Sequence, residues 1–222
     1  MSSLLKYDSE FNLISSYDIT SISDTPSGIT FDGKYFWIND GLTNIWQVYT
    51  SGDTATLIKS IKPSGFKASE VFREMVFDGK YLITLNIDEI TGISIYSKIE
   101  RDGSNIKTIF NSGAGDFNYR GCAFNGKVIG IINPSTANVE IMDFNGNIIN
   151  IFTTGGIHGI VYNEKYWIIT NIFASTMTIE INDGNGNIIK NFSLNSPGGG
   201  NFGPDITFDG KYYYLIEETP IG

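Results

Sequence analysis

The sequence predicts an all-β domain, a five-bladed β-propeller with four-stranded antiparallel blades, and three observations lead to it. A short hairpin motif recurs five times along the 222 residues. The copies are spaced at a distance that suits four short strands each. The chain also begins with one half of the repeat and ends with the other half.

The motif is an aromatic residue followed by a turn and a second strand. Its leading aromatic residues are spaced by 46, 47, 38 and 46 positions. This period fits four strands and is too long for a two-helix or leucine-rich repeat. Each copy therefore marks one blade, and the copies are Phe31-Asp-Gly-Lys-Tyr35, Phe77-Asp-Gly-Lys-Tyr81, Phe124-Asn-Gly-Lys-Val128, Tyr162-Asn-Glu-Lys-Tyr166 and Phe208-Asp-Gly-Lys-Tyr212.

Each copy is expected to form the first hairpin of a blade, with residues 28–31 as one strand and 34–39 as the next in the first copy. Asp-Gly and Asn-Gly are favoured in two-residue turns whose central residues both have positive φ. In the fourth copy Glu164 replaces the glycine, and Glu is poor at positive φ. The fourth blade is therefore predicted to have a different or strained turn.

A second hairpin follows each first one, as in residues 139–152 and 178–192. The amino terminus matches this second hairpin, because Tyr7-Asp8 and residues 12–17 align with Met142-Asp143 and residues 147–152. The chain ends after a first hairpin, 206–217. We therefore expect the amino-terminal strands (3–19) to pair with the carboxy-terminal hairpin (206–217) and close the ring in one shared blade.

The whole chain, 1–222, is predicted to be one propeller domain. The alternative is an open stack of sheets, which is disfavoured because its exposed edge strands would promote aggregation. The blades are expected at about 28–61, 73–110, 120–152 and 158–194, and at 204–218 together with 3–19.

Composition limits the partners. The formal net charge is -9 and the 15 Lys and Arg residues are scattered, so no nucleic-acid partner is expected. No apolar run has the length of a membrane span, so no membrane insertion is expected. No signal peptide is apparent, which predicts a cytoplasmic or virion-associated protein. The single Cys122 excludes an internal disulfide.

The segment Phe31-Asp-Gly-Lys-Tyr-Phe-Trp-Ile38 and its weaker copies resemble the DG-x-Y/N-[LIF]-W hairpin of the NHL/YncE-like repeat propellers, with five blades as a variant. The resemblance spans nearly the whole chain and implies a propeller, but no particular activity. Lyases of that group use histidine, an acid and a divalent metal. Because His158 is the only histidine here, the resemblance assigns no catalytic residue.

The register of the repeats predicts a ring of polar side chains at the end of each blade's second strand. The members stand nine residues after each leading aromatic and all carry a side-chain carbonyl or carboxylate. They could cap turns, or they could bind a polar ligand or a hard cation around the central channel. These candidate ligand-binding residues are Asp40, Asn86, Asn133, Asn171 and Glu217.

A second set of equivalent positions lies three residues before each leading aromatic, where the innermost strands begin. Glycine occupies three of them, at 28, 121 and 159, and only Glu74 and Asp205 bring charge. If the protein is an enzyme, its catalytic candidates are the carboxylates of the two sets, Asp40, Glu74, Asp205 and Glu217.

We expect a non-catalytic binding or assembly module that recognises a polar ligand, a glycan or a protein partner through its loop-bearing face, as a virion or cell-surface component. The alternative is a glycosidase- or lyase-type enzyme with carboxylates in the central channel. A third interpretation is a scaffold stabilised by a divalent cation in the channel; otherwise no cofactor is expected. If the polar ring is structural, the loops at 62–73 and 195–204 are the expected protein-binding surface. The sequence leaves the oligomeric state open.

Overall fold

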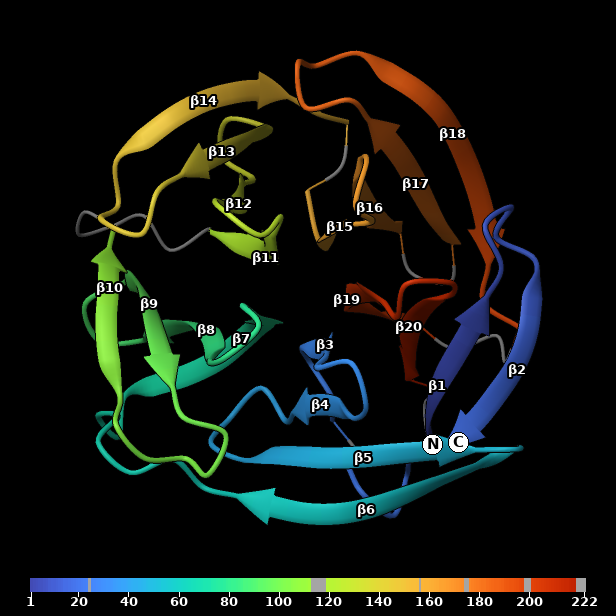
Figure 1. Cartoon of the computed structure of the whole chain (residues 1–222), viewed down its shortest axis with the longest axis horizontal. Helices are drawn as coiled ribbons and strands as arrows, with labels where there is room; N and C mark the ends of the chain where they lie inside the picture. Colours follow the sequence, from blue (N-terminus) through green and yellow to red (C-terminus); the bar gives the residue numbers. More distant parts are fainter. Residues whose placement is uncertain (24, 113–118, 156, 174–175, 198–200, 219–222) are drawn as a thin grey trace.

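The computed structural model contains five sheets of four antiparallel strands around a central axis (Figure 1). It describes residues 1–23, 25–112, 119–155, 157–173, 176–197 and 201–218. Within these ranges every regular element is a strand, and no helix long and apolar enough to cross a membrane is found. The predicted all-β propeller with five four-stranded blades is confirmed.

Each blade runs outward from an innermost strand near the axis. Blade 1 contains β3 (Ile29–Phe31), β4 (Phe36–Asn39), β5 (Ile45–Ser51) and β6 (Thr54–Ile61); blade 2 contains β7 (Glu70–Phe77), β8 (Leu82–Asp88), β9 (Ile93–Ile99) and β10 (Lys107–Asn111). Blade 3 contains β11 (Arg120–Phe124), β12 (Ile129–Asn133), β13 (Asn138–Met142) and β14 (Ile148–Thr153); blade 4 contains β15 (Ile160–Tyr162), β16 (Trp167–Phe173), β17 (Thr176–Asn182) and β18 (Ile188–Asn195).

Blade 5 is built from both ends of the chain. Its order is β19 (Asn201–Phe208), β20 (Tyr213–Glu218), β1 (Ser2–Tyr7) and β2 (Leu13–Asp18). Antiparallel pairing runs from Ser2 opposite Glu218 to Tyr7 opposite Tyr213. Phe11, in the turn after β1, stacks on Tyr213 with ring centroids 4.6 Å apart. The predicted closure by the amino-terminal strands is therefore confirmed.

The first-hairpin turns differ in detail from the prediction. Asp32 N–H donates to the carbonyl of Tyr35, so Gly33 and Lys34 are the central residues of the turn. Gly33 has φ 93°, and Lys34 is not in the positive-φ region; glycine at the first central position with positive φ is typical of a type II′ turn. Asp32 precedes the turn, and its Oδ1 accepts the N–H groups of Lys34 and Tyr35. The prediction of positive φ at the Asp was wrong.

Blade 4 keeps the same turn despite its glutamate. Glu164 has φ 71°, and Asn163 Oδ1 accepts the N–H groups of Lys165 and Tyr166 as the aspartates do elsewhere. A non-glycine residue in this region is strained. The strained-turn prediction is therefore confirmed.

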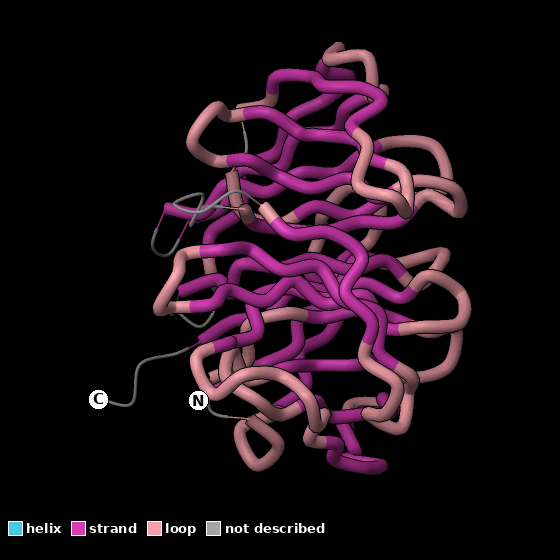
Figure 2. Tube along the Cα trace, turned by 90° about the vertical axis from the view of Figure 1, so that its left-hand side faces the viewer, coloured by secondary structure: helices cyan, strands magenta, loops and turns pink. Residues whose placement is uncertain are grey.

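The core lies between neighbouring blades rather than at the axis. Seen edge-on, the strands fill the middle of the disc and the turns lie on its two faces (Figure 2). Five clusters of buried apolar side chains separate the blades, one at each interface. In the interface between blades 3 and 4, Gly130 allows Trp167 to pack closely, since a Cβ at position 130 would lie 2.5 Å from the indole ring.

Candidate functional site

Two acidic side chains meet in the middle of the propeller. Glu74 lies on β7 and Asp205 on β19, the innermost strands of blades 2 and 5, and both are at equivalent register positions. They are 2% and 1% exposed, respectively. Their carboxyl groups share a side-chain hydrogen bond. The structure therefore brings together the two charged members of the set at the start of the innermost strands.

Glycine makes this meeting sterically possible. Gly28 is the equivalent residue of blade 1, which lies between blades 2 and 5. A Cβ at position 28 would lie 3.0 Å from the Cα of Glu74 and 2.5 Å from Asn39 Nδ2. The missing side chain therefore lets β7, which carries Glu74, approach β3 closely. On the same strand Ile29 donates its N–H to Asp205 Oδ2 at 2.8 Å.

The two carboxyl groups have different roles in the shared bond. Asp205 Oδ1 also accepts the N–H of the next residue, Ile206, with a distance of 2.8 Å between Oδ1 and the nitrogen. Asp205 accepts two backbone N–H groups and Glu74 one, from Gly121. Backbone donors favour the ionised form of the acid that accepts them, so Glu74 carries the proton. Burial raises the pKa of Glu74 well above its usual range, and the adjacent Asp205 raises it further. Burial also raises the pKa of Asp205, to about 7, although the hydrogen bonds that Asp205 accepts lower it.

The surroundings of the pair are apolar with one cation nearby. Arg120, exposed at the start of β11, lowers the pKa of Glu74 by its charge. Cys122 is buried close to both acids, and burial raises the pKa of its thiol. Among the described residues no group of three or more His, Cys, Asp and Glu converges to hold a metal ion. A buried acid pair with shifted pKa values is able to move a proton, provided that a substrate can reach it.

His158, the single histidine, is held by its neighbours. Its Nδ1 accepts the N–H of Ile172 at 3.1 Å and lies 3.2 Å from Asn171 Oδ1. Burial lowers the pKa of the imidazole, and the charge of Arg120 lowers it further. The side chain therefore anchors the start of blade 4 to the end of β16.

Two of the five residues predicted to form a polar ring cap turns of their own blades. Asp40 Oδ1 accepts the N–H groups of residues 42–44, and Asn133 Oδ1 accepts that of Ser135. Asn133 also donates from Nδ2 to Glu140, 3.0 Å away.

The other three bond differently. Asn171 donates from Nδ2 to the carbonyl of Gly155, and Glu217 accepts from the hydroxyl of Ser196. Asn86 is 1% exposed, and its Oδ1 has no hydrogen-bond partner in the described part of the chain. Ligand binding by these five residues stays a prediction, and Asn86 is the member with an unused acceptor.

Asn86 lines a pocket on the loop-bearing face, between blades 1 and 2. The pocket holds about 370 Å³. Half of its ten lining residues are apolar: Leu42, Pro63, Phe66, Ala68 and Phe72. The polar half consists of Asn86, Thr43, Glu70, Lys62 and Lys67. Phe66 and Phe72 are in edge-to-face contact with centroids 5.2 Å apart. The 62–73 loop, an expected protein-binding surface, supplies most of this wall.

The comparisons with known proteins agree with this fold. Myxococcus xanthus glutaminyl cyclase aligns with 96% of this chain and 93% of its own, at 10% identity and a TM-score of 0.58. A chain of a nidogen/laminin complex aligns with 93% of this chain and 98% of its own, at 11% identity and a TM-score of 0.53. The PQQ-bound aldose sugar dehydrogenase of Streptomyces coelicolor aligns with 87% of this chain and 94% of its own, at 8% identity and a TM-score of 0.51.

The chain is thus a β-propeller, and at these identities the likeness extends to the fold alone. The similar structures include enzymes and a component of a protein complex, so they do not select an activity. No protein-family model matches the chain, and no curated protein matches its sequence. Membership of the NHL/YncE-like group stays a prediction.

Proposed function

We propose that the protein is a binding module whose ligand site is the pocket between blades 1 and 2. The observation that carries the proposal is an open pocket whose lining includes Asn86, a buried residue with an unpartnered side-chain oxygen. A buried acceptor without a donor costs free energy comparable to a lost hydrogen bond. A ligand that donates to this oxygen recovers that free energy.

The lining favours a protein partner. Leu42, Pro63 and Phe66 offer an apolar surface for a hydrophobic side chain, while Asn86 offers an acceptor for an amide N–H. A peptide segment presents both groups a few ångströms apart. Leu42 is 57% exposed, so its side chain is accessible to a partner. A glycan ligand and a virion or cell-surface setting stay predictions.

The test uses N-acetyl-L-phenylalanine methylamide, which carries an aromatic side chain and two amide donors. Titrated into the labelled protein, it is expected to shift the backbone amide resonances of residues 42–43, 62–68 and 86. Asn86→Leu removes the acceptor and should weaken binding by roughly tenfold. Asn191→Leu, at an exposed position on β18, is the matched control and should bind as the unmodified protein does. Equal affinity of the unmodified protein and both variants for the compound would refute the proposal.

A second candidate function is acid–base chemistry in the channel, which the Glu74–Asp205 pair favours. It requires that a substrate reach these two groups, although both are nearly inaccessible. Coupling with a water-soluble carbodiimide and glycine methyl ester distinguishes the two candidates. If the channel is sealed, as the binding module implies, Glu10 with its 62% exposed side chain reacts and Glu74 does not. Labelling of Glu74 in the folded protein would favour the enzyme.

A further inference from the structure

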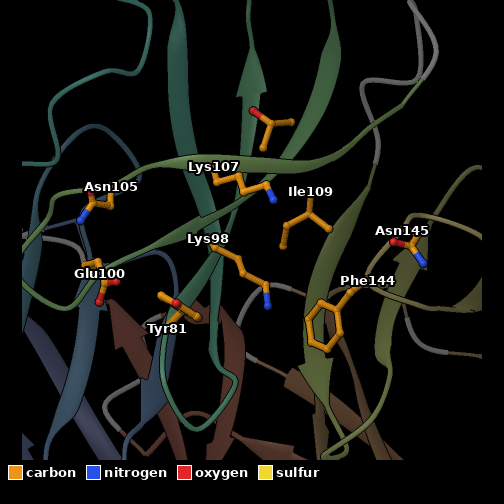
Figure 3. Close-up of a pocket in the computed structure, with 9 residues that line it drawn as sticks. Tyr81, Lys98, Glu100, Asn105, Lys107, Ile109, Phe144 and Asn145 are labelled. Carbon is orange, nitrogen blue, oxygen red and sulfur yellow. The ribbon is translucent and has the colours of Figure 1, made fainter.

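A second pocket lies on the opposite face of the disc, where the tight turns are. It holds about 680 Å³ between the outer parts of blades 2 and 3. Blade 2 supplies Tyr81, Lys98 and Lys107, and blade 3 supplies Phe144 and Asn145. Figure 3 shows the two lysines on neighbouring strands, with the ring of Phe144 beside them.

The two lysines are directly opposite each other. Lys107 on β10 pairs with Lys98 on β9, so both side chains project from the same side of the sheet. Like charges in this arrangement destabilise a strand pair. The chain nevertheless places them there while carrying a formal net charge of -9. A bound anion would turn this repulsion into attraction.

A salt bridge and two aromatic rings fix the position of the Lys98 ammonium group. Its Nζ donates to Asp78 Oδ2 at 3.0 Å, and it lies 3.8 Å from the centre of the Phe144 ring and 5.4 Å from that of Tyr81. The side chain is 24% exposed. One salt bridge uses one of three ammonium donors, so the others remain free to bind a ligand at a fixed position.

Lys107 supplies the second charge. Its side chain is exposed, and no described residue forms an ion pair with it. Glu100 and Asn105 lie to one side of the lysines and offer an acceptor carboxylate and an amide (Figure 3). The pocket therefore presents two cations with hydrogen-bonding groups for hydroxyls beside them.

We infer that this pocket binds a small organic anion, a carboxylate or phosphate on a hydroxyl-bearing body, with the anionic group between Lys98 and Lys107 and the hydroxyls at Glu100 and Asn105. Charge-assisted hydrogen bonds to an anion are about twice as strong as neutral ones. The site is separate from the Asn86 pocket, so the two can be tested independently.

The experiment compares three probes that share a sugar body. Glucuronate carries a carboxylate, glucose 6-phosphate carries a phosphate, and glucose is neutral. Binding is followed by calorimetry and by shifts in the backbone amide resonances of residues 98, 107 and 108. We expect at least one of the anionic probes to bind at this site and glucose to bind at least tenfold more weakly. Preference between the two anions identifies the anionic group.

Two variants complete the test. Lys107→Gln removes one exposed charge without disturbing the Lys98–Asp78 pair, and should weaken anion binding by roughly tenfold. Lys211→Gln removes an exposed charge from the turn of blade 5 and should leave binding unchanged. The inference is overturned if neither anion binds at tens of millimolar, if glucose binds equally well, or if both variants lose the same affinity.

Discussion

Glu74 and Asp205 share a hydrogen bond across the central channel, although 130 residues of the chain separate them. The contact follows from symmetry: the two residues occupy equivalent positions on innermost strands, and glycine occupies the other three positions. Gly28 leaves the space and Ile29 supplies a backbone donor to Asp205. The middle of the disc therefore holds a proton-sharing pair.

The pair makes stability depend on pH. The pKa of Asp205 is raised to about 7 and that of Glu74 is raised well above its usual range, so the folded state binds more protons than the unfolded chain from pH about 4 to at least about 7. The free energy of unfolding should therefore fall as pH rises through this window, by at most about 1.4 kcal/mol per pH unit for each group. Urea unfolding at pH 5, 6, 7 and 8 measures the slope.

Glu74→Gln isolates this contribution. The amide keeps the shape of the protonated acid but does not titrate, so the slope between pH 5 and 8 should become shallower. Surface carboxylates such as Asp8, Asp143 and Asp183 have lowered pKa values and act only below this window. His158 contributes equally in both proteins. An unchanged slope in the variant would show that the two acids do not share a proton.

Closure of the ring depends on the amino-terminal strands. Deleting residues 1–17 removes β1 and nearly all of β2, which exposes the edge of β20. It also removes the Phe11 ring that stacks on Tyr213. We expect loss of cooperative unfolding, measured by circular dichroism during thermal denaturation. A truncated protein that melts like the intact chain would contradict the closure.

A circular permutant is the control for this deletion. Joining residue 222 to residue 1 and opening the chain between Lys62 and Ala68 keeps every strand of blade 5. Because β20 and β1 are already neighbours in one sheet, the permutant should fold and unfold cooperatively. If it fails to fold while the intact chain folds, chain order rather than blade completion controls stability.

Substitutions in the hairpin turns are expected to change stability in opposite directions. Gly33, Gly79 and Gly210 have φ of 93°, 94° and 96°, and no atom lies within 4 Å of a Cβ added to any of them. Changing each to Ala should therefore cost about 1 kcal/mol from backbone strain alone. Glu164→Gly should stabilise blade 4 by a similar amount, because Glu164 has φ 71°. Stabilisation by the alanines, measured by urea unfolding, would contradict the turn assignment.

Gly28 predicts a larger effect. A methyl group at this position would meet Asn39 Nδ2 at 2.5 Å and the backbone of Glu74 at 3.0 Å. Gly28→Ala should destabilise the fold by about 1–3 kcal/mol, the usual cost of overpacking, and should flatten the pH dependence by separating Glu74 from Asp205. Gly126→Ala, at a turn with open space around it, is the control: it should cost only about 1 kcal/mol of backbone strain at φ 93° and leave the pH dependence unchanged. Equal pH dependence in the two variants would argue against close packing at Gly28.

The repeat period and the split terminal blade were sufficient to predict the architecture, because each blade must bury its faces against its neighbours. The convergence of Glu74 and Asp205 was also accessible, since rotation about the axis places equivalent residues together. The turns were predicted one residue too early because Asp32 and its equivalents act as side-chain acceptors, and the motif alone does not distinguish that role from a central turn position.

The two pockets could not be predicted. The Asn86 pocket depends on how the 62–73 loop folds back against Leu42, and loop packing leaves no periodic signal. The opposition of Lys98 and Lys107 depends on how the loop between β9 and β10 folds, because the register shift in β10 lies beyond this pair, between Thr108 and Phe110. Their spacing in the sequence does not show which strand positions become neighbours.

The most direct test of the binding-module proposal is a crystal structure of the protein soaked with N-acetyl-L-phenylalanine methylamide. The proposal predicts the aromatic ring between Leu42 and Phe66, and an amide N–H within hydrogen-bonding distance of Asn86 Oδ1. The same compound bound in the channel against Glu74 and Asp205, with the pocket between blades 1 and 2 empty, would contradict it.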